Sequence, residues 1–158
     1  HFDHSGGLRT YVDEGATVVT HQANVAFYEK AWATPRNLIG DRLAKSGKKA
    51  AFQPVTDRGE LKGTNNRVIE LHLLRGNPHN EQILVAWLPA EKVLFQSDMI
   101  NPPAPNAQVP PPTPTITNFA DNLQRLKIDP EQIVGGHGGR IATRADLNAV
   151  TGRKTGTN

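Results

Sequence analysis

Histidine and aspartate side chains gather at four points of the chain, each beside serine, glycine, proline or asparagine. The first group opens the sequence and the others follow predicted strands: His1, Asp3, His4, His79, Asp98 and His137. Imidazole and carboxylate groups both bind Zn²⁺ and similar ions. Alternate side chains of an extended or turning segment point the same way, so His1 and Asp3 would share one side while His4 points elsewhere. One short loop can therefore supply ligands to two neighbouring metal positions.

Each of these residues also has an ordinary structural interpretation. Taken singly, His4, His79 and His137 are better explained as surface or core side chains. For Asp98 the alternative is a helix or turn cap. Taken together beside Gly and Pro turns at strand ends, they favour a metal site. The physical reason is that a buried loop rich in His and Asp is costly unless a cation compensates it.

Hydrophobic periodicity predicts the elements that position these residues. The predicted strands are 16–20, 51–55, 67–74, 83–88, 93–95 and 133–134. The predicted helices are 8–12, 22–32, 117–127 and 143–152, the last opened by a capping box at Thr143. Residues 33–50 are predicted to be an exposed connection and 57–59 a turn. Asp98 lies just past the predicted strand 93–95, which is where open sheets covered by helices usually carry their chemistry.

The other histidines, the tryptophans and the proline-rich segment receive structural interpretations. His21 is expected to end a strand and His72 to lie at the surface, while Trp32 and Trp87 belong to the core. Residues 101–115 contain seven prolines and are predicted to form an extended loop with polyproline character. This loop either shapes a substrate pocket or is an inert surface loop; the sequence favours neither.

Four ordered blocks in their flanking contexts resemble the metallo-β-lactamase superfamily of metal-dependent hydrolases. That family carries a His-x-His-x-Asp-His loop, then a lone His, a bridging Asp and a last His. The blocks here begin at Phe2-Asp3-His4-Ser5-Gly6-Gly7-Leu8 and continue at His79, Leu88–Asp98 and His137. The resemblance extends from residue 1 to about residue 150 and departs from the family at one point. The chain opens at the second His of the loop, without the first His and the strands before it.

The resemblance implies an α/β fold, a metallo-β-lactamase-like αβ/βα sandwich truncated to the part from the metal-binding loop onward. We expect one domain over residues 1–158, with the proline-rich loop 101–115 within it. A sheet built for two halves exposes an apolar face when one half is missing, so a homodimer or a second chain is the expected means of completing the sandwich.

The resemblance also assigns roles to the six residues. His1 and His79 would belong to a first metal position, Asp3, His4 and His137 to a second, and Asp98 would bridge both. One or two Zn²⁺ ions are expected, weakly held at the position containing His1 and His79, with Mn²⁺ or Fe as alternatives. The α-amine of His1 offers one replacement for the missing ligand. Asp3 would in addition orient the nucleophile, which makes it the expected catalytic residue.

The implied activity is hydrolysis of a small-molecule carbonyl substrate by a metal-bound hydroxide. The expected substrates are a β-lactam, lactone, ester or thioester. The alternative is a non-catalytic metal-binding remnant, or a half-domain that assembles with a partner.

The composition and charge of the chain bear on membrane spans, on cysteine chemistry and on nucleic-acid binding. The chain has 37% hydrophobic and 21% charged residues and no apolar run of the ~18–20 residues that a membrane span needs. It has no cysteine, which excludes disulfides and thiolate ligands. Lys45, Lys48 and Lys49 form the one tight basic cluster, which is expected to be a solvated loop, so no nucleic-acid partner is expected.

Overall fold

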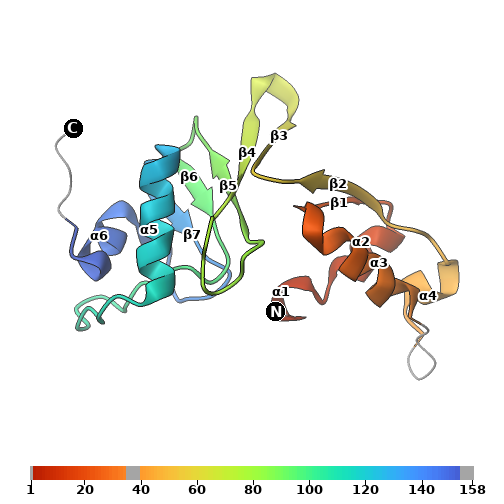
Figure 1. Cartoon of the computed structure of the whole chain (residues 1–158), viewed down its shortest axis with the longest axis horizontal. Coiled ribbons are helices and arrows are strands. Elements are labelled where there is room, and N and C mark those ends of the chain that lie inside the picture. The colour runs from red at the N-terminus through yellow and green to blue at the C-terminus, as the bar shows by residue number, and fades with distance from the viewer. Residues whose placement is uncertain (1, 35–39, 154–158) are drawn as a thin grey trace. The chain divides into compact units, whose positions relative to one another are not determined.

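The computed structural model describes residues 2–34 and 40–153. The chain divides into two units, His1–Thr56 and Asp57–Asn158, each with its own hydrophobic core. In Figure 1 the first unit runs from red to amber and the second from yellow to blue. The single domain expected over residues 1–158 stays a prediction.

The first unit is built on two parallel strands, β1 (Thr17–His21) and β2 (Ala51–Val55). Its helical segments are α1 (Phe2–Ser5), α2 (Leu8–Asp13), η1 (Gln22–Asn24), α3 (Val25–Ala33) and α4 (Arg42–Ser46). Val12, Val18 and Leu43 form a small core, against which Trp32 and Phe52 pack. Both strands were predicted from their β-branched and aromatic residues, and His21 ends the first of them as expected.

The prediction that residues 33–50 form an exposed connection is wrong over α4. Asp41 caps this helix by accepting a hydrogen bond from the Ala44 N–H at 2.8 Å, and Gly47 ends it with a φ of 65°. Leu43 is buried between these caps. A single buried residue gives no periodicity, so the pattern offered no signal for this helix. Residues 35–39 lie outside the described part.

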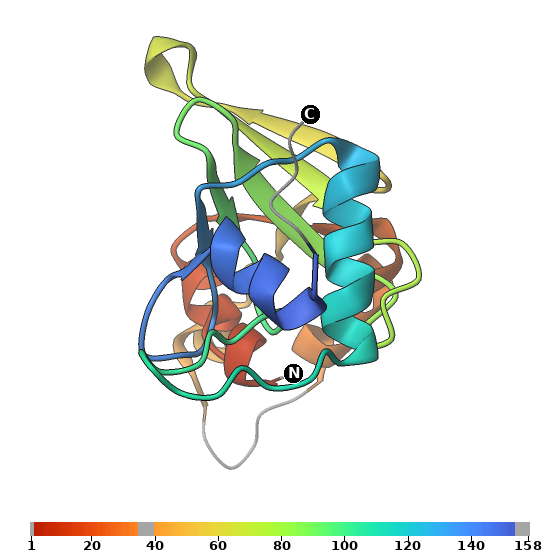
Figure 2. The same ribbon diagram turned by 90° about the vertical axis from the view of Figure 1, so that its left-hand side faces the viewer.

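The second unit contains a six-stranded sheet in the order β3-β4-β5-β6-β7-β8. The strands are β3 (Arg58–Lys62), β4 (Val68–Leu73), β5 (Leu84–Leu88), β6 (Val93–Phe95), β7 (Gln132–Val134) and β8 (Ala142–Thr143). All neighbours are antiparallel except β6 and β7. A 3₁₀ turn, η2 (Thr64–Asn66), joins β3 to β4. Figures 1 and 2 show helices α5 (Pro114–Leu126) and α6 (Arg144–Thr151) on one face of this sheet.

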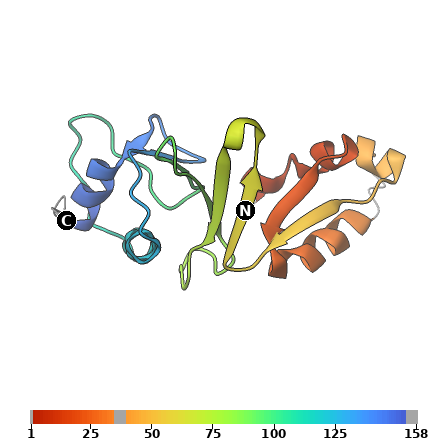
Figure 3. The same ribbon diagram turned by 90° about the horizontal axis from the view of Figure 1, so that it is seen from above.

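Helix α5 covers the sheet because its apolar residues recur at helical spacing. Phe119 and Leu123 are fully buried, and Ile116 and Leu126 pack against the same core. Trp87 of β5 belongs to this core, as predicted. Seen from above in Figure 3, α5 and α6 remain together beside the strands. No helix in the described residues is long and apolar enough to cross a membrane.

Two predictions for the sheet are wrong. Residues 57–59 were expected to form a turn, but Arg58 and Gly59 belong to β3, whose pairing with β4 runs from Arg58↔His72 to Lys62↔Val68. His72 was expected at the surface, but only 5% of it is exposed, because β3 and β5 flank it on both sides. Its Nε2 lies 2.8 Å from a Glu70 carboxylate oxygen, and its buried Nδ1 has no hydrogen-bond partner among the described residues.

Candidate metal centre

Three of the predicted ligands converge in the second unit. His79 Nε2 lies 3.1 Å from Asp98 Oδ2, and His137 Nε2 lies 3.3 Å from Asp98 Oδ1. Each imidazole therefore faces a different oxygen of the same carboxylate. The exposed fraction of the side chain is 15% for Asp98, 26% for His79 and 52% for His137. The three come from separate loops, after β4, β6 and β7.

His79 is held by a network of buried amides. The Asn77 side chain, 1% exposed, accepts from the His79 N–H at 3.0 Å and donates to Asn118 Oδ1 at 2.9 Å. One turn further along α5, Asn122 accepts from the Arg75 N–H at 2.9 Å. The loop that carries His79 is thus attached to α5 at two places before His79 is reached.

Asp98 lies on a loop that is closed by the Gln96 side chain. Gln96 Oε1 accepts from the Met99 N–H at 2.6 Å, and Gln96 Nε2 donates to the Ile100 carbonyl at 3.1 Å. Met99 and Ile100 are themselves buried in the core. The loop is therefore anchored on both sides of Asp98.

The glycines around His137 allow close approach to this loop. The Gly136 N–H donates to the Ser97 carbonyl at 2.9 Å. Gly138 has a φ of +113°, and a Cβ built there would lie 2.2 Å from Asn101 Oδ1. Any side chain at this position would meet both an unfavourable backbone conformation and a steric clash.

The sequence singled out the candidate ligands but not the residues that hold their loops in place. Gln96, Asn77, Asn118 and Asn122 were not singled out. Their one signal is polarity in otherwise apolar surroundings, as in α5, where Asn118 and Asn122 stand one turn apart beside the apolar stripe.

The remaining predicted ligands belong to the first unit. Asp3 and His4 lie in α1, with His4 Nε2 3.5 Å from Asp3 Oδ2. Residues 2–5 are helical, so the alternation expected for an extended segment does not apply to them. His1, the other predicted ligand, lies outside the described residues. The metal-binding role of all six residues stays a prediction.

The donor set of the second unit fits a transition metal. Two imidazole nitrogens and two carboxylate oxygens are ligands that Zn²⁺ accepts at ~2.0–2.2 Å. Two ligands of one tetrahedral ion at that bond length lie about 3.4 Å apart. The observed nitrogen–oxygen separations of 3.1 and 3.3 Å are close to this value. Each His–Asp98 pair can therefore share an ion after a small outward shift.

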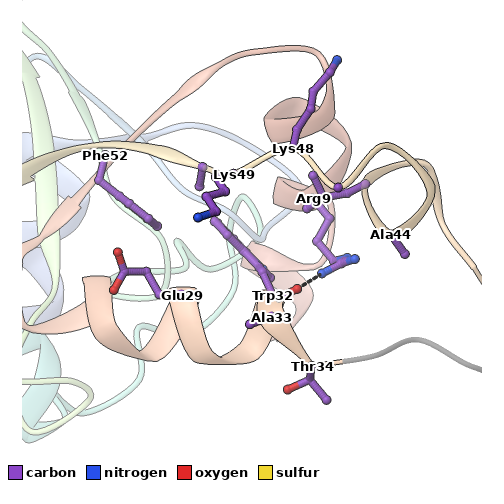
Figure 4. A pocket seen from close by; sticks show the side chains of 12 residues that line it. Arg9, Glu29, Trp32, Ala33, Thr34, Ala44, Lys48, Lys49 and Phe52 are labelled. Carbon is purple, nitrogen blue, oxygen red and sulfur yellow. Dashed lines mark hydrogen bonds between the residues drawn. The ribbon is translucent and has the colours of Figure 1, made fainter.

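A separate cavity of about 710 Å³ lies in the first unit (Figure 4). Trp32 and Phe52 line it with stacked rings 5.8 Å apart, and Lys48 and Lys49 border it. Arg9 also contributes to the wall, paired with Asp41 and hydrogen-bonded to the Trp32 carbonyl at 3.4 Å. Trp32, predicted to be core, is only partly buried at this wall. None of the described predicted metal ligands lines the cavity.

Comparison with solved structures identifies the fold. The rubredoxin oxygen:oxidoreductase of Desulfovibrio gigas matches 94% of this chain with a TM-score of 0.60 and 17% identity, over 40% of its own length. A metallo-β-lactamase from Pontibacter korlensis matches 92% of this chain (TM-score 0.56, 18% identity, 61% of its own length). The BLEG-1 B3 metallo-β-lactamase matches 94% (TM-score 0.58, 17% identity, 70% of its own length).

No protein-family model and no curated protein matches the sequence. The structural likenesses confirm the predicted α/β fold of the metallo-β-lactamase type. The chain spans between 40% and 70% of the length of these three solved chains.

Proposed function

We propose that this chain is part of a metal-dependent hydrolase acting on a carbonyl substrate: a β-lactam, a lactone, an ester or a thioester. The observation that carries the proposal is the convergence of His79 and His137 on separate oxygens of Asp98, at separations close to those of ligands sharing an ion. Solved structures with the same fold include metallo-β-lactamases, which supports the choice of reaction class.

In this proposal Asp98 bridges two metal positions. His79 and His1 hold the first, and His137, Asp3 and His4 hold the second. Zn²⁺ is the leading candidate, and a set of nitrogen and oxygen donors without thiolate also accepts Mn²⁺ or Fe.

Each ligand residue has a defined protonation requirement. His79 and His137 must present an unprotonated Nε2, which leaves the ring proton on Nδ1. Asp98 must be ionised so that each of its oxygens can accept. When bound, Zn²⁺ lowers the pKa of a coordinated water to ~7 and polarises a substrate carbonyl. The carboxylate of Asp3 would orient the attacking hydroxide.

The second candidate is a metal-binding half-domain without turnover, completed by a homodimer or another chain. It is favoured by one observation, the partial coverage of the solved chains. It predicts metal binding, no hydrolysis and association in solution.

The test uses metal-stripped protein reloaded with Zn²⁺, Mn²⁺ or Fe²⁺ under anaerobic conditions. Metal content is measured by elemental analysis, association by sedimentation, and hydrolysis with a chromogenic β-lactam, a lactone and a nitrophenyl ester. Asp98→Ala should abolish hydrolysis and weaken metal binding. Asp129→Ala, at a side chain that is 84% exposed, is the matched control and should change neither.

The outcomes separate the candidates. Metal binding with hydrolysis that Asp98→Ala removes supports the hydrolase. Metal binding without turnover of any substrate supports the half-domain. A chain that binds none of the three metals contradicts both.

A further inference from the structure

We propose that Gln96 is the positioning residue that fixes Asp98 relative to His137, and that its carboxamide thereby sets the metal affinity of the site. This inference rests on the proposed metal-binding function and assigns a role to a residue outside the ligand set.

The Gln96 carboxamide uses both of its ends within the Asp98 loop. Its oxygen accepts from the Met99 N–H at 2.6 Å, and its nitrogen donates to the Ile100 carbonyl at 3.1 Å. The residue is 7% exposed, so water cannot readily replace either partner. Loss of the carboxamide would leave a buried donor and a buried acceptor unsatisfied, which is costlier than the hydrogen bonds themselves are stabilising. Asp98, which lies between Gln96 and Met99, is held in place by this closure.

The same residue joins the Asp98 loop to the loop of His137. The Gln96 N–H donates to the Val134 carbonyl at 2.9 Å, and one residue later the Ser97 carbonyl accepts from the Gly136 N–H at 2.9 Å. Gly135 leaves room for the carboxamide, since a Cβ there would lie 2.9 Å from Gln96 Nε2. A shift of the Gln96 side chain therefore moves Asp98 and the start of the His137 loop together.

Residues that hold metal ligands in place without touching the metal change metal affinity by about 10- to 100-fold when they are removed. We expect Gln96→Leu to weaken Zn²⁺ binding by about this factor and to alter the visible spectrum of the Co²⁺-loaded protein. Gln96→Glu keeps the acceptor for the Met99 N–H but places an oxygen against the Ile100 carbonyl. It should therefore also weaken Zn²⁺ binding, through repulsion at the Ile100 carbonyl rather than through loss of the Met99 hydrogen bond.

Two variants control for other effects. Gln124→Glu makes the same chemical change on the exposed side of α5 and should leave affinity and spectrum unchanged. Leu126→Ala removes a side chain that packs against the core far from the loop in sequence. It should lower stability without changing the Co²⁺ spectrum, which separates positioning from general destabilisation.

A measurement without metal tests whether Gln96 holds the Asp98 loop, separately from the proposed function. Amide hydrogen exchange should show protection of the Met99 N–H in the unaltered chain and its loss in Gln96→Leu, with the Leu123 N–H in α5 still protected. An unprotected Met99 N–H in the unaltered chain overturns the inference whether or not metal binds. Metal affinity that is equal in the unaltered chain and both Gln96 variants also overturns it. Protection of Met99 in a chain that binds no metal confirms the clamp on Asp98 and contradicts the proposed function and the role in metal affinity.

Discussion

Gly138 and Gly139 follow His137 directly, but only Gly138 adopts a conformation that resists a side chain. Its φ is +113°, and an added Cβ would lie 2.2 Å from Asn101 Oδ1, whereas a Cβ at Gly139 meets nothing within 4 Å. We expect Gly138→Ala to destabilise the second unit by roughly 1–3 kcal/mol and to weaken metal binding. Gly139→Ala should change stability by less than about 0.5 kcal/mol. Denaturant unfolding and Zn²⁺ titration of the two variants check this, and equal behaviour would show that the close approach is not required.

The side-chain amide of Asn77 is expected to contribute to the stability of the second unit by holding the loop that carries His79. Asn77→Ala removes the acceptor for the His79 N–H and the donor to Asn118, both in a site that is 1% exposed. The cost should be about 1–3 kcal/mol of unfolding free energy, because buried partners lose their hydrogen bonds. Thr117→Ala on the exposed side of α5 is the control. Unchanged denaturant midpoints for both variants would contradict the prediction.

The sequence singled out the candidate ligands His79, Asp98 and His137 but not the amides that hold their loops. These three residues stood out only as a set, because several His and Asp side chains beside Gly and Pro turns at strand ends favour a metal site that none of them indicates singly. Gln96 and Asn77 did not stand out, because amide side chains are common in loops of every kind. The partner of Asn77, Asn118, lies far along the chain. The partners of Gln96, Met99 and Ile100, are near in sequence but come within reach only once the loop has folded.

The start of helix α6 is held by the Asp146 carboxylate, which accepts four hydrogen bonds from two residues. Asp146 accepts from the Thr143 N–H and hydroxyl at 2.8 Å each, and Arg140 binds both of its oxygens at 2.8 and 2.7 Å. Arg140 also donates from Nε to the Pro103 carbonyl at 3.1 Å, so the pair connects the start of the proline-rich loop to α6. Arg140 is the main cause of a pKa for Asp146 well below its ordinary value.

This lowered pKa gives the stability of the second unit a defined pH dependence. A carboxyl group whose pKa is lower in the folded state stabilises fully above its unfolded pKa of ~3.9. The contribution decreases as the pH falls from there toward the folded pKa. Asp146→Asn should therefore destabilise most at pH 7, by about 1 kcal/mol from the weakened cap, and progressively less below pH 4. Urea midpoints across pH 2.5–7 check this, and a difference independent of pH would contradict it.

The elements that were predicted correctly carry their signals locally. Helix α5 has an apolar stripe, and α6 has both halves of a capping box, Thr143 and Asp146. Strands β3 and β8 were missed because their signal lies in the neighbouring strand. β3 is a largely polar segment with Gly59 at its second position, and it becomes a strand only by pairing with β4.

The two units differ in the size of their cores. Three buried residues, Val12, Val18 and Leu43, form the core of the first unit, whereas that of the second contains thirteen. Local stability follows the number of buried apolar contacts. Without metal, we therefore expect the backbone amides of β1 and β2 to exchange much faster than those of β4, β5 and α5. Exchange monitored by mass spectrometry on peptides of each unit measures this directly.

If the proposed ligand set is right, bound metal should reduce the difference in amide exchange rate between the two units. Asp3 and His4 come from the first unit and His79, Asp98 and His137 from the second, so one bound ion would stabilise both. At 100 times the dissociation constant, a ligand stabilises the folded state by about 2.7 kcal/mol. Zn²⁺ should therefore slow exchange in α1 and α2 as well as in the Asp98 loop, and His4→Ala should abolish the slowing in α1 and α2 alone. His21→Ala, at a half-buried position outside the ligand set, serves as the histidine control. Slowing confined to the second unit in the unaltered chain would remove Asp3 and His4 from the site and leave His79, Asp98 and His137 as its ligands.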